Sequence, residues 1–351
     1  MSLSKTAIRI LPETIKLIKI TDAEYFSAEY KEYISNSKLG LADPNNDGSR
    51  EKYESGFSSD YSASFELGSA IHAKVLQPEE FIISDIRKPS GKLGLFAEYV
   101  YDFRQTGKSI KESILLASEK ANYYSGKFTI TREKTAIKQS LPFYLNRIRF
   151  KEEPTNKVTL YLSDASASKF TKCMDGIERD PNVLNTLRPK GLLSDPECYN
   201  EYAIFAEAEV TLESGEVKIV KLKAKLDNFT IDHETQVYTL NDLKTTGKPV
   251  SFFMGNTVTQ VGDDGSISKV WHDGSFQKYS YYRQMGMYLW LLSCYMQQNK
   301  LNYKPKANMV VVETIPEFRT KIYPVKPKDI KKGLDDFKRL LIMVSEWIEK
   351  R

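Results

Sequence analysis

The sequence predicts an α/β or α+β protein with a helical N-terminal elaboration. Two observations carry this prediction. Apolar residues recur at helical spacing through much of residues 61–200, and from about Glu201 the spacing changes to every second residue, which is typical of strands. The order along the chain is then helices, three successive strands, a helix, a strand and a helix, which favours one layered core.

The length of 351 residues suffices for one large core or two modest ones. We expect residues 1–60 to form an N-terminal leader and loop that pack on the core. Residues 61–351 are expected to form a single domain, with a helical part over 61–200 and a sheet-containing core over 201–351.

The first half of the chain reads as irregular structure followed by helices. Residues 1–60 end in ADPNNDGSREKYESG, a loop dense in turn-forming residues. SFELGSAIHAKVLQPEEF, residues 64–81, has helical apolar spacing and contains a proline that closes the helix. Residues 95–148 and 163–188 show the same spacing and predict further helices.

The second half contains the strands. YAIFAEAEVTL, VKIVKLKAKLDNFTI and VYTLNDLKTT predict three strands in succession. A polar, glycine-containing loop over 255–274 and a long helix over about 276–298 follow, and then a strand over 308–315. The predicted C-terminal helix has an amphipathic stripe at helical spacing, formed by Ile330, Leu334, Phe337, Leu341, Val344 and Ile348.

Composition excludes several classes of protein. No run of about 18 apolar residues occurs, so we expect neither a membrane-spanning helix nor a membrane partner. The N-terminus lacks the apolar region and cleavage site of a secretory signal. Three widely spaced cysteines fit a reducing compartment and cannot build a four-thiolate metal site. The net charge of +5 permits an anionic partner without requiring one.

The most informative stretch is KLKAKLDNFTIDHETQVYTLNDLKTTG, residues 221–247. It is predicted to form two strands around a four-residue loop, His233 to Gln236. This loop places Asp227 opposite Asp242, with their Cβ atoms about 4.5–5.5 Å apart. Lys244 lies two residues after Asp242 and therefore emerges on the same face of the strand.

Two facing carboxylates repel each other, and a divalent cation between them removes this conflict. Mg²⁺ prefers carboxylate oxygens and leaves room for phosphate oxygens, and a bound cation acidifies a water in its coordination shell. Lys244 would orient that water and offset charge on the phosphate. These residues are the minimum for metal-assisted phosphodiester hydrolysis. In an alternative interpretation each aspartate pairs with a lysine on an exposed sheet face.

Further residues carry a resemblance to a known family. KLDNF followed by NDLKTT resembles the PD-(D/E)XK nuclease superfamily, whose core reads Asp, a gap, then Asp/Glu-x-Lys. GSAIHAKVLQPEEF and SFQKYSYYRQMGMYLW are similar to its phage RecE-type (exodeoxyribonuclease VIII-like) branch, with Gly-x-x-x-His upstream and Gln-x-x-x-Tyr downstream. The resemblance implies a restriction-endonuclease-like core with a central mixed sheet flanked by helices. The superfamily's proline is absent before Asp227.

The resemblance also implies a metal site. Asp227 and Asp242 would hold one or two Mg²⁺ (or Mn²⁺) ions, with the Leu243 carbonyl as a further ligand. Lys244 would assist the attacking water. His72 would contact the metal or a neighbouring water, although by its apolar helical setting alone His72 is more typical of a core residue.

Other residues are implied at the DNA. Gln284 and Tyr288 share one helical face and by the resemblance would touch DNA near the scissile phosphate; alternatively, this face packs on the sheet. Lys223 and Lys225 are candidates for phosphate contacts or for an ordinary solvated face. Glu201 is a candidate additional acidic residue.

The implied activity is that of a Mg²⁺-dependent 5′-to-3′ exodeoxyribonuclease on double-stranded DNA in phage recombination or DNA processing. It would expose a 3′ tail for a single-strand annealing protein. The resemblance further implies a phage or prophage protein in the cytoplasm of a bacterial host, and a ring-shaped homo-oligomer is a candidate assembly. The alternatives are a structure-specific or single-strand endonuclease of the same superfamily and a non-catalytic DNA-binding protein on a nuclease scaffold.

Two features stay open on sequence alone. The loop over 255–274 would cover or clamp DNA, or it is a tolerated surface insertion. Phe252, Phe253 and Trp271 are candidates for stacking on a base at a duplex end, with core packing as the alternative.

Overall fold

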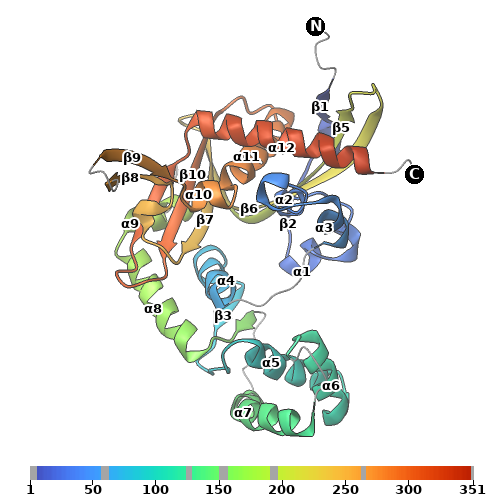
Figure 1. Ribbon diagram of the computed structural model, residues 1–351, viewed down its shortest axis with the longest axis vertical. Helices are drawn as coiled ribbons and strands as arrows, with labels where there is room; N and C mark the ends of the chain where they lie inside the picture. Colours follow the sequence, from blue (N-terminus) through green and yellow to red (C-terminus); the bar gives the residue numbers. More distant parts are fainter. Residues whose placement is uncertain are drawn as a thin grey trace. The chain divides into compact units, whose positions relative to one another are not determined.

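The chain divides into two compact units, shown in Figure 1. One unit comprises residues 1–58 and 177–351, and the other comprises residues 59–176. The computed structural model describes residues 6–56, 63–123, 129–149, 157–189, 197–261 and 266–348.

The first unit is built on a seven-stranded sheet with the strand order β1–β5–β6–β7–β10–β11, in which β2 also pairs with β5. The strands are β1 (Ala7–Ile10), β2 (Lys16–Lys19), β5 (Glu197–Thr211), β6 (Val217–Asp232), β7 (Val237–Thr246), β10 (Lys304–Glu313) and β11 (Thr320–Pro324). β7 and β10 are parallel and the other pairs are antiparallel. The predicted central mixed sheet is therefore confirmed.

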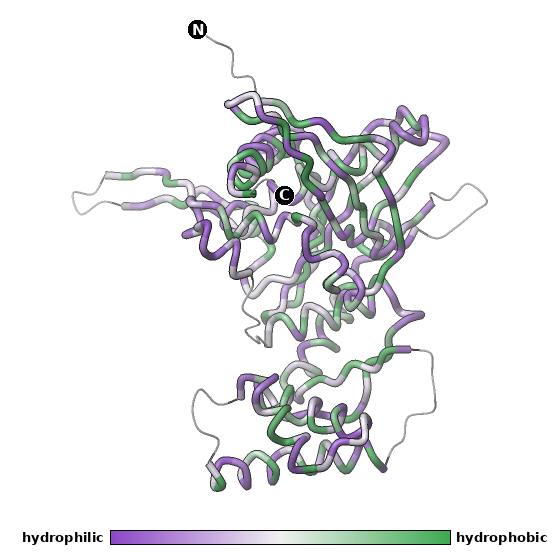
Figure 2. Tube along the Cα trace, turned by 90° about the vertical axis from the view of Figure 1, so that its right-hand side faces the viewer, coloured by the Kyte–Doolittle hydropathy of each residue, from purple (hydrophilic) through white to green (hydrophobic). Residues whose placement is uncertain are grey.

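Two long helices, α11 (Tyr281–Gln298) and α12 (Pro327–Trp347), pack on the hydrophobic core of this sheet (Figure 1). Figure 2 shows hydrophobic segments along the central strands and these helices. The two helices approach closely at Gly286 and Gly333, where a Cβ atom would collide with the backbone of the other helix. The predicted C-terminal stripe is confirmed, because all of its residues are buried in the core or pack against it.

The N-terminal segment differs from the irregular leader that the sequence predicts. It contributes β1 and β2 to the sheet, and it forms the short helices α1 (Asp22–Tyr25), α2 (Asn36–Gly40) and α3 (Arg50–Ser55) and the 3₁₀ turns η1 (Pro12–Thr14), η2 (Ala28–Tyr30) and η3 (Pro44–Asn46). Strands of four residues are too short to show an alternating pattern, and helices of four to six residues are too short to show helical spacing.

The second unit is mainly helical. Its elements are α4 (Ala63–Leu76), β3 (Phe81–Ile83), α5 (Lys92–Gln105), α6 (Ile110–Lys120), α7 (Ile130–Arg149), β4 (Val158–Leu160) and most of α8 (Asp164–Glu178). The helices confirm the predictions for 64–81, 95–148 and 163–188. Residues 124–128 of these stretches lie outside the described residues. In the last stretch, α9 (Pro181–Leu187) belongs to the first unit. None of the described helices is both long and apolar enough to cross a membrane.

The segment over 255–274 is not a loop. It forms a hairpin of β8 (Asn256–Val261) and β9 (Ile267–His272) that projects from the sheet (Figures 1 and 2), with residues 262–265 outside the described part. The predicted long helix over 276–298 is also interrupted. Ser280 adopts a left-handed conformation with φ of 52° and separates α10 (Ser275–Lys278) from α11. The 3₁₀ turn η4 (Val250–Phe252) precedes the hairpin.

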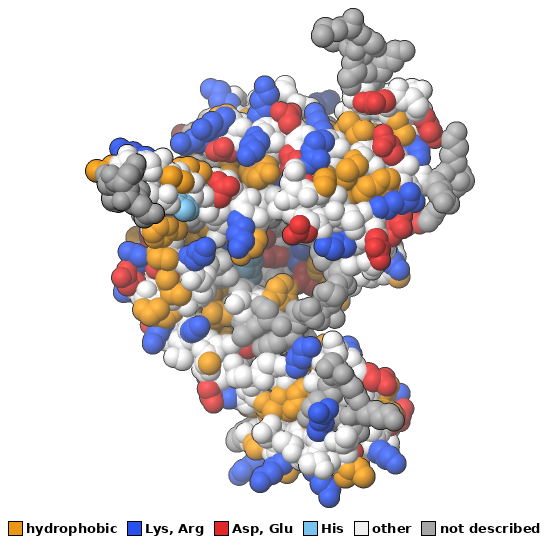
Figure 3. All heavy atoms as spheres, viewed as in Figure 1, with side chains coloured by type: hydrophobic (Ala, Val, Ile, Leu, Met, Phe, Trp, Pro, Cys, Tyr) orange, Lys and Arg blue, Asp and Glu red, His pale blue; other side chains and the backbone are white. Residues whose placement is uncertain are grey.

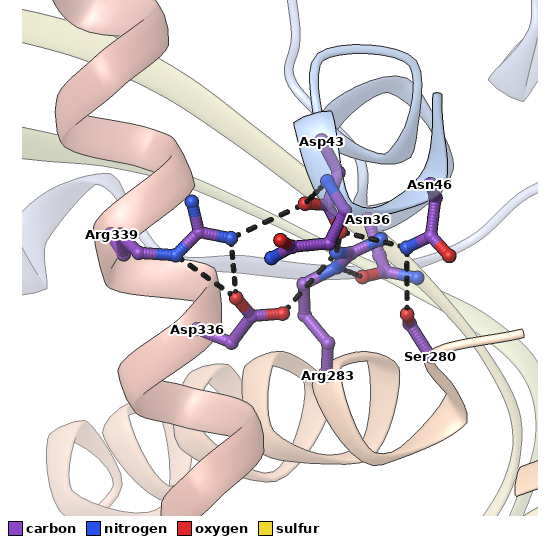
Figure 4. Close-up of polar contacts among 8 residues, drawn as sticks. Asn36, Asp43, Asn46, Ser280, Arg283, Asp336 and Arg339 are labelled. Carbon is purple, nitrogen blue, oxygen red and sulfur yellow. Dashed lines mark hydrogen bonds and ion pairs between the residues drawn. The ribbon is translucent and has the colours of Figure 1, made fainter. Parts of the chain in front are cut away.

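A buried polar network ties the N-terminal segment to both long helices (Figure 4). Arg283 lies at the start of α11, and its Nη1 is 2.6 Å from Asp43 Oδ2 and 3.3 Å from Oδ2 of Asp336 in α12. Arg339 of α12 also pairs with both carboxylates, and Asn36 accepts a hydrogen bond from Arg283. Asp43 is only 1% exposed, and although burial opposes its charge, Arg283 and Asn46 hold its pKa below the usual value.

We expect Asp43→Asn to lower the free energy of unfolding by about 3–5 kcal/mol, because it leaves two guanidinium groups against one carboxylate in a buried cluster. All three tryptophans lie in the first unit, so urea unfolding followed by tryptophan fluorescence measures this change. Asp47→Asn, an exposed position of the same segment, is the matched control. Equal stability of the two variants would contradict the assignment.

Candidate active site

The hairpin of β6 and β7 has the predicted register near its turn. Asn228 pairs with Asn241 and Ile231 with Tyr238, and the four-residue loop 233–236 joins the strands. The prediction fails beyond this point. The described pairing of the two strands ends at Asn228 and Asn241, so the predicted direct pairing of Asp227 with Asp242 does not form.

The physical reason is a side-chain contact. The Leu243 N–H donates a 2.8 Å hydrogen bond to Asp227 Oδ2 instead of joining a ladder with β6. From there β7 continues its pairing with β10, and β6 continues with β5. The two aspartates therefore lie where the sheet opens between β6 and β7.

The side-chain alternation of β5 and β6 shifts by one residue at this opening. On one side of the acidic residues, Ile204 of β5 and its partner Ala224 of β6 face the large core. On the other side, Tyr199 of β5 and its partner Phe229 of β6 face this core, although an unbroken alternation would place their even-numbered neighbours there. Glu201 lies at the shift and has a φ of 58° within a strand. A non-glycine residue in the left-handed region is uncommon, and such strain gathers at functional sites.

Asp242 is the most enclosed carboxylate of the site, with an exposed fraction of 1%. Its Oδ1 accepts a 2.6 Å hydrogen bond from Gln284 Nε2 of α11, and its Oδ2 lies 2.5 Å from Lys244 Nζ. The same ammonium group lies 3.7 Å from Asp227 Oδ2. Asp227 and Asp242 thus both lie near Lys244, and Gln284 contacts Asp242.

Glu201 supplies a third carboxylate from the neighbouring strand. One of its oxygens lies within 4.8 Å of an oxygen of Asp227. Lys225 Nζ lies 2.7 Å from Glu201 and 2.5 Å from Asp22 of α1. Lys225 therefore holds Glu201 in place and connects the site to the N-terminal segment.

The charge of Lys244 follows from these neighbours. Burial opposes a charged amine, but the carboxylates of Asp242 and Asp227 outweigh burial and raise the pKa of Lys244. The side chain is consequently an ammonium group at neutral pH, which donates hydrogen bonds and cannot accept a proton. The ring of Tyr281 lies 5.4 Å from the same nitrogen.

Tyr288 lies among these groups but is enclosed. It shares the Gln284 face of α11, is 9% exposed and belongs to the large core. Burial, and after it the charges of neighbouring groups that include Asp242 and Asp227, raise the pKa of Tyr288 well above its usual value. The hydroxyl therefore stays protonated, and its predicted contact with DNA remains a prediction.

The ammonium group of Lys223 is enclosed and bonds the backbone of the N-terminal segment. Lys223 is 6% exposed, and its Nζ donates a 2.8 Å hydrogen bond to the Tyr25 carbonyl. The predicted contact of Lys223 with a phosphate is therefore not supported by its position. Burial, together with the charge of Lys38, lowers the pKa of Lys223 to about 8.

This lowered pKa predicts a pH dependence of stability. The unfolded side chain has a pKa of about 10.4 and binds more protons than the folded one between that value and the folded pKa of about 8. The free energy of unfolding should therefore rise across this pH interval relative to Lys223→Met. Urea unfolding at several pH values measures it, and a constant difference between the proteins would contradict the lowered pKa.

The remaining predicted residues are placed as follows. Leu243 is buried beside the two aspartates, whereas His72 is half-buried on α4 of the second unit. Phe253 is 1% exposed and packs in the core, which is the alternative to stacking on a base. Phe252 and Trp271 are 42% and 54% exposed.

A ladder of asparagines supports the site from the other face of the sheet, and the sequence analysis missed it. Asn308 donates to Asn241, Asn241 donates to Asn228, and Asn228 donates to Asn200, with distances of 2.7–2.9 Å. Asn228 also donates to the Leu187 carbonyl at the end of α9. The ladder crosses the four strands β5, β6, β7 and β10 beside the acidic residues. The signal was an asparagine adjacent to each aspartate, Asp227 and Asp242.

The donor set fits a hard divalent cation. The site has three carboxylates from the adjacent strands β5, β6 and β7, namely Glu201, Asp227 and Asp242. The Lys225 ammonium group pairs with Glu201, and the Lys244 ammonium group lies near Asp227 and Asp242. Carboxylate oxygens are the preferred ligands of Mg²⁺ and Mn²⁺, and the site contains no cysteine that would favour a softer metal. These acids, together with the backbone carbonyl of Leu243, are the candidates to hold the ion.

Comparisons with known proteins give weak similarity to solved structures. No protein-family model matches the sequence, and no curated protein matches it. The structure is similar to the crystal structure of a "Putative exonuclease" from Eubacterium rectale, with 14% sequence identity, coverage of 95% of this chain and 89% of that chain, and a TM-score of 0.45. A similarity of this size carries no argument about function.

Proposed function

We propose that the chain is a metal-dependent deoxyribonuclease that hydrolyses DNA phosphodiesters. The observation that carries the proposal is the convergence of Asp227, Asp242, Lys244 and Gln284 where the sheet opens between β6 and β7. The resemblance to PD-(D/E)XK nucleases rests on the same residues and supports the same chemistry. It also supports His72 as a further contact of the metal or its water.

Each residue has a role that its environment supports. In hydrolysis the oxygen of a water molecule forms a bond to phosphorus while the bond to the leaving oxygen breaks; the water loses one proton and the leaving oxygen gains one. A bound Mg²⁺ would supply charge stabilisation and acidify the water. Lys244, held as an ammonium group, donates a hydrogen bond to the developing negative charge. Gln284 fixes the orientation of Asp242.

We further propose double-stranded DNA as substrate and 5′-to-3′ exonucleolytic action, both on the resemblance alone. The proposed setting is phage recombination in the bacterial cytoplasm, with a single-strand annealing protein as partner and a homo-oligomer as the assembly. The side chain of Lys225 is 14% exposed and pairs with two carboxylates. These contacts support a role in positioning Glu201 rather than a contact with phosphate.

Linear duplex labelled at its 5′ or 3′ end, together with covalently closed circles, tests the proposal. We expect Mg²⁺-dependent release of the 5′ label from linear DNA, no cleavage of circles and no activity with a chelator. Cleavage of circles would favour the endonuclease alternative. Binding of DNA without cleavage under any metal condition would favour the non-catalytic alternative.

A further inference from the structure

The second unit contains a cavity that the proposed hydrolysis does not use. It has a volume of about 380 Å³ and lies among α5, α6 and α7. Phe96 and Ile114 are buried in its wall, and Ile110 and Leu141 are half exposed at its edge. Figure 3 shows hydrophobic side chains gathered over these helices beside Lys and Arg side chains. The volume falls in the range of small-ligand sites, which is about 300–1,000 Å³.

One polar group in the wall of the cavity lacks a partner. Ser140 is 6% exposed, and its hydroxyl makes no hydrogen bond to any part of the chain that the structure describes. Leaving a buried hydroxyl unsatisfied is unfavourable. A polar atom of a ligand in the cavity would satisfy it.

A charged group also lines the cavity. The Arg104 guanidinium donates through Nη1 to the Lys108 carbonyl, and within the described ranges no carboxylate pairs with it. The surroundings favour an anion, because α5, α6 and α7 together carry nine Lys or Arg residues and five Asp or Glu residues. The planar guanidinium matches the geometry of a carboxylate.

We propose that this cavity binds an apolar group, such as an aromatic ring, that carries a carboxylate. The apolar part fills the cavity, the carboxylate pairs with Arg104, and the Ser140 hydroxyl bonds a polar atom of the inserted group. The carboxylate belongs either to a free small molecule or to the C-terminal residue of another polypeptide. This site is independent of the proposed hydrolysis.

Calorimetric titration of the full chain with 3-(4-hydroxyphenyl)propanoate tests the site. We expect saturable binding that weakens at least about tenfold in Arg104→Gln and is lost in Leu141→Trp, which blocks the edge of the cavity. Ser140→Ala should weaken binding less. Both positions Arg104 and Leu141 are exposed, so the variants should melt like the wild type. Lys169→Gln, on the exposed face of α8, is the matched control.

A second arm distinguishes the two sources. A short acetylated peptide that ends in tyrosine is titrated with a free and with an amidated C-terminus. Tighter binding of the free-ended peptide than of the small carboxylate identifies a polypeptide end, and the reverse order identifies a small molecule. Absence of saturable binding for both ligands at millimolar concentration would overturn the proposal, as would unchanged affinity in Arg104→Gln and Leu141→Trp.

Discussion

Asp242→Asn is expected to lower the rate of DNA hydrolysis by at least about 10³-fold, the upper end of what one electrostatic contact contributes. The substitution keeps the size of the side chain and the hydrogen bond from Gln284, but it removes the charge and replaces the oxygen beside Lys244 with an NH₂ group. Asp227→Asn is expected to act in the same way, because both carboxylates contact Lys244 and are the proposed metal ligands. The measurement is the initial rate on labelled linear duplex at saturating Mg²⁺.

Two controls make this loss interpretable. Asp335→Asn removes a carboxylate from the exposed side of α12 and should leave the rate unchanged. Circular dichroism and the melting temperature show whether each variant is folded. Wild-type activity in folded Asp242→Asn or Asp227→Asn would remove these residues from the site.

Lys244→Met is expected to produce a second large loss, about 10²–10³-fold in kcat, because the developing charge on the phosphate loses its hydrogen-bond donor. Its effect on metal binding should have the opposite sign. The ammonium group lies 2.5 Å from Asp242 and 3.7 Å from Asp227, so it competes with a cation for the same oxygens. The variant should therefore bind Mn²⁺ more tightly than the wild type while hydrolysing DNA more slowly.

This opposite movement separates a catalytic lysine from a structural one. A lysine that only held the two aspartates in place would, on removal, weaken metal binding along with activity. In the metal-free protein, the neighbouring carboxylates raise the pKa of Lys244 above the usual lysine value of about 10.4. Equal kcat values for Lys244→Met and the wild type would contradict the role.

Much of the site could be predicted from the sequence because a tight turn fixes its register. The loop 233–236 sets the pairing of β6 and β7, which ends one residue short of Asp227 and Asp242 and so leaves both carboxylates near Lys244. The resemblance placed Gln284 at the site, and helical spacing added that it lies one turn before Tyr288 on the same face of a long helix. Local rules sufficed for the two aspartates.

What could not be predicted depends on contacts between distant segments. The opening of the sheet results from the bond between the Leu243 N–H and Asp227, and simple register arithmetic assumes that pairing continues. The left-handed conformation of Glu201 and its pairing with Lys225 leave no pattern in the sequence. The parallel pairing of β7 with β10 brings together strands separated by two helices and a hairpin.

The predicted loop over 255–274 failed for a different reason. Its strands are rich in Thr and Val and lie on the surface, so they lack the apolar alternation by which a half-buried strand is identified. The hairpin pairs through its own backbone and projects from the sheet. Lys223 likewise seemed to belong to a solvated face, because its burial depends on Tyr25 of the N-terminal segment.

The account depends most on carboxylates of adjacent strands sharing a divalent cation, and Mn²⁺ binding measured by electron paramagnetic resonance tests this directly. The wild type should bind Mn²⁺ saturably. Asp227→Asn and Asp242→Asn should each weaken binding by at least about tenfold, a change of about 1.4 kcal/mol, while Asp335→Asn binds like the wild type. Unchanged Mn²⁺ affinity in both site variants would contradict the account.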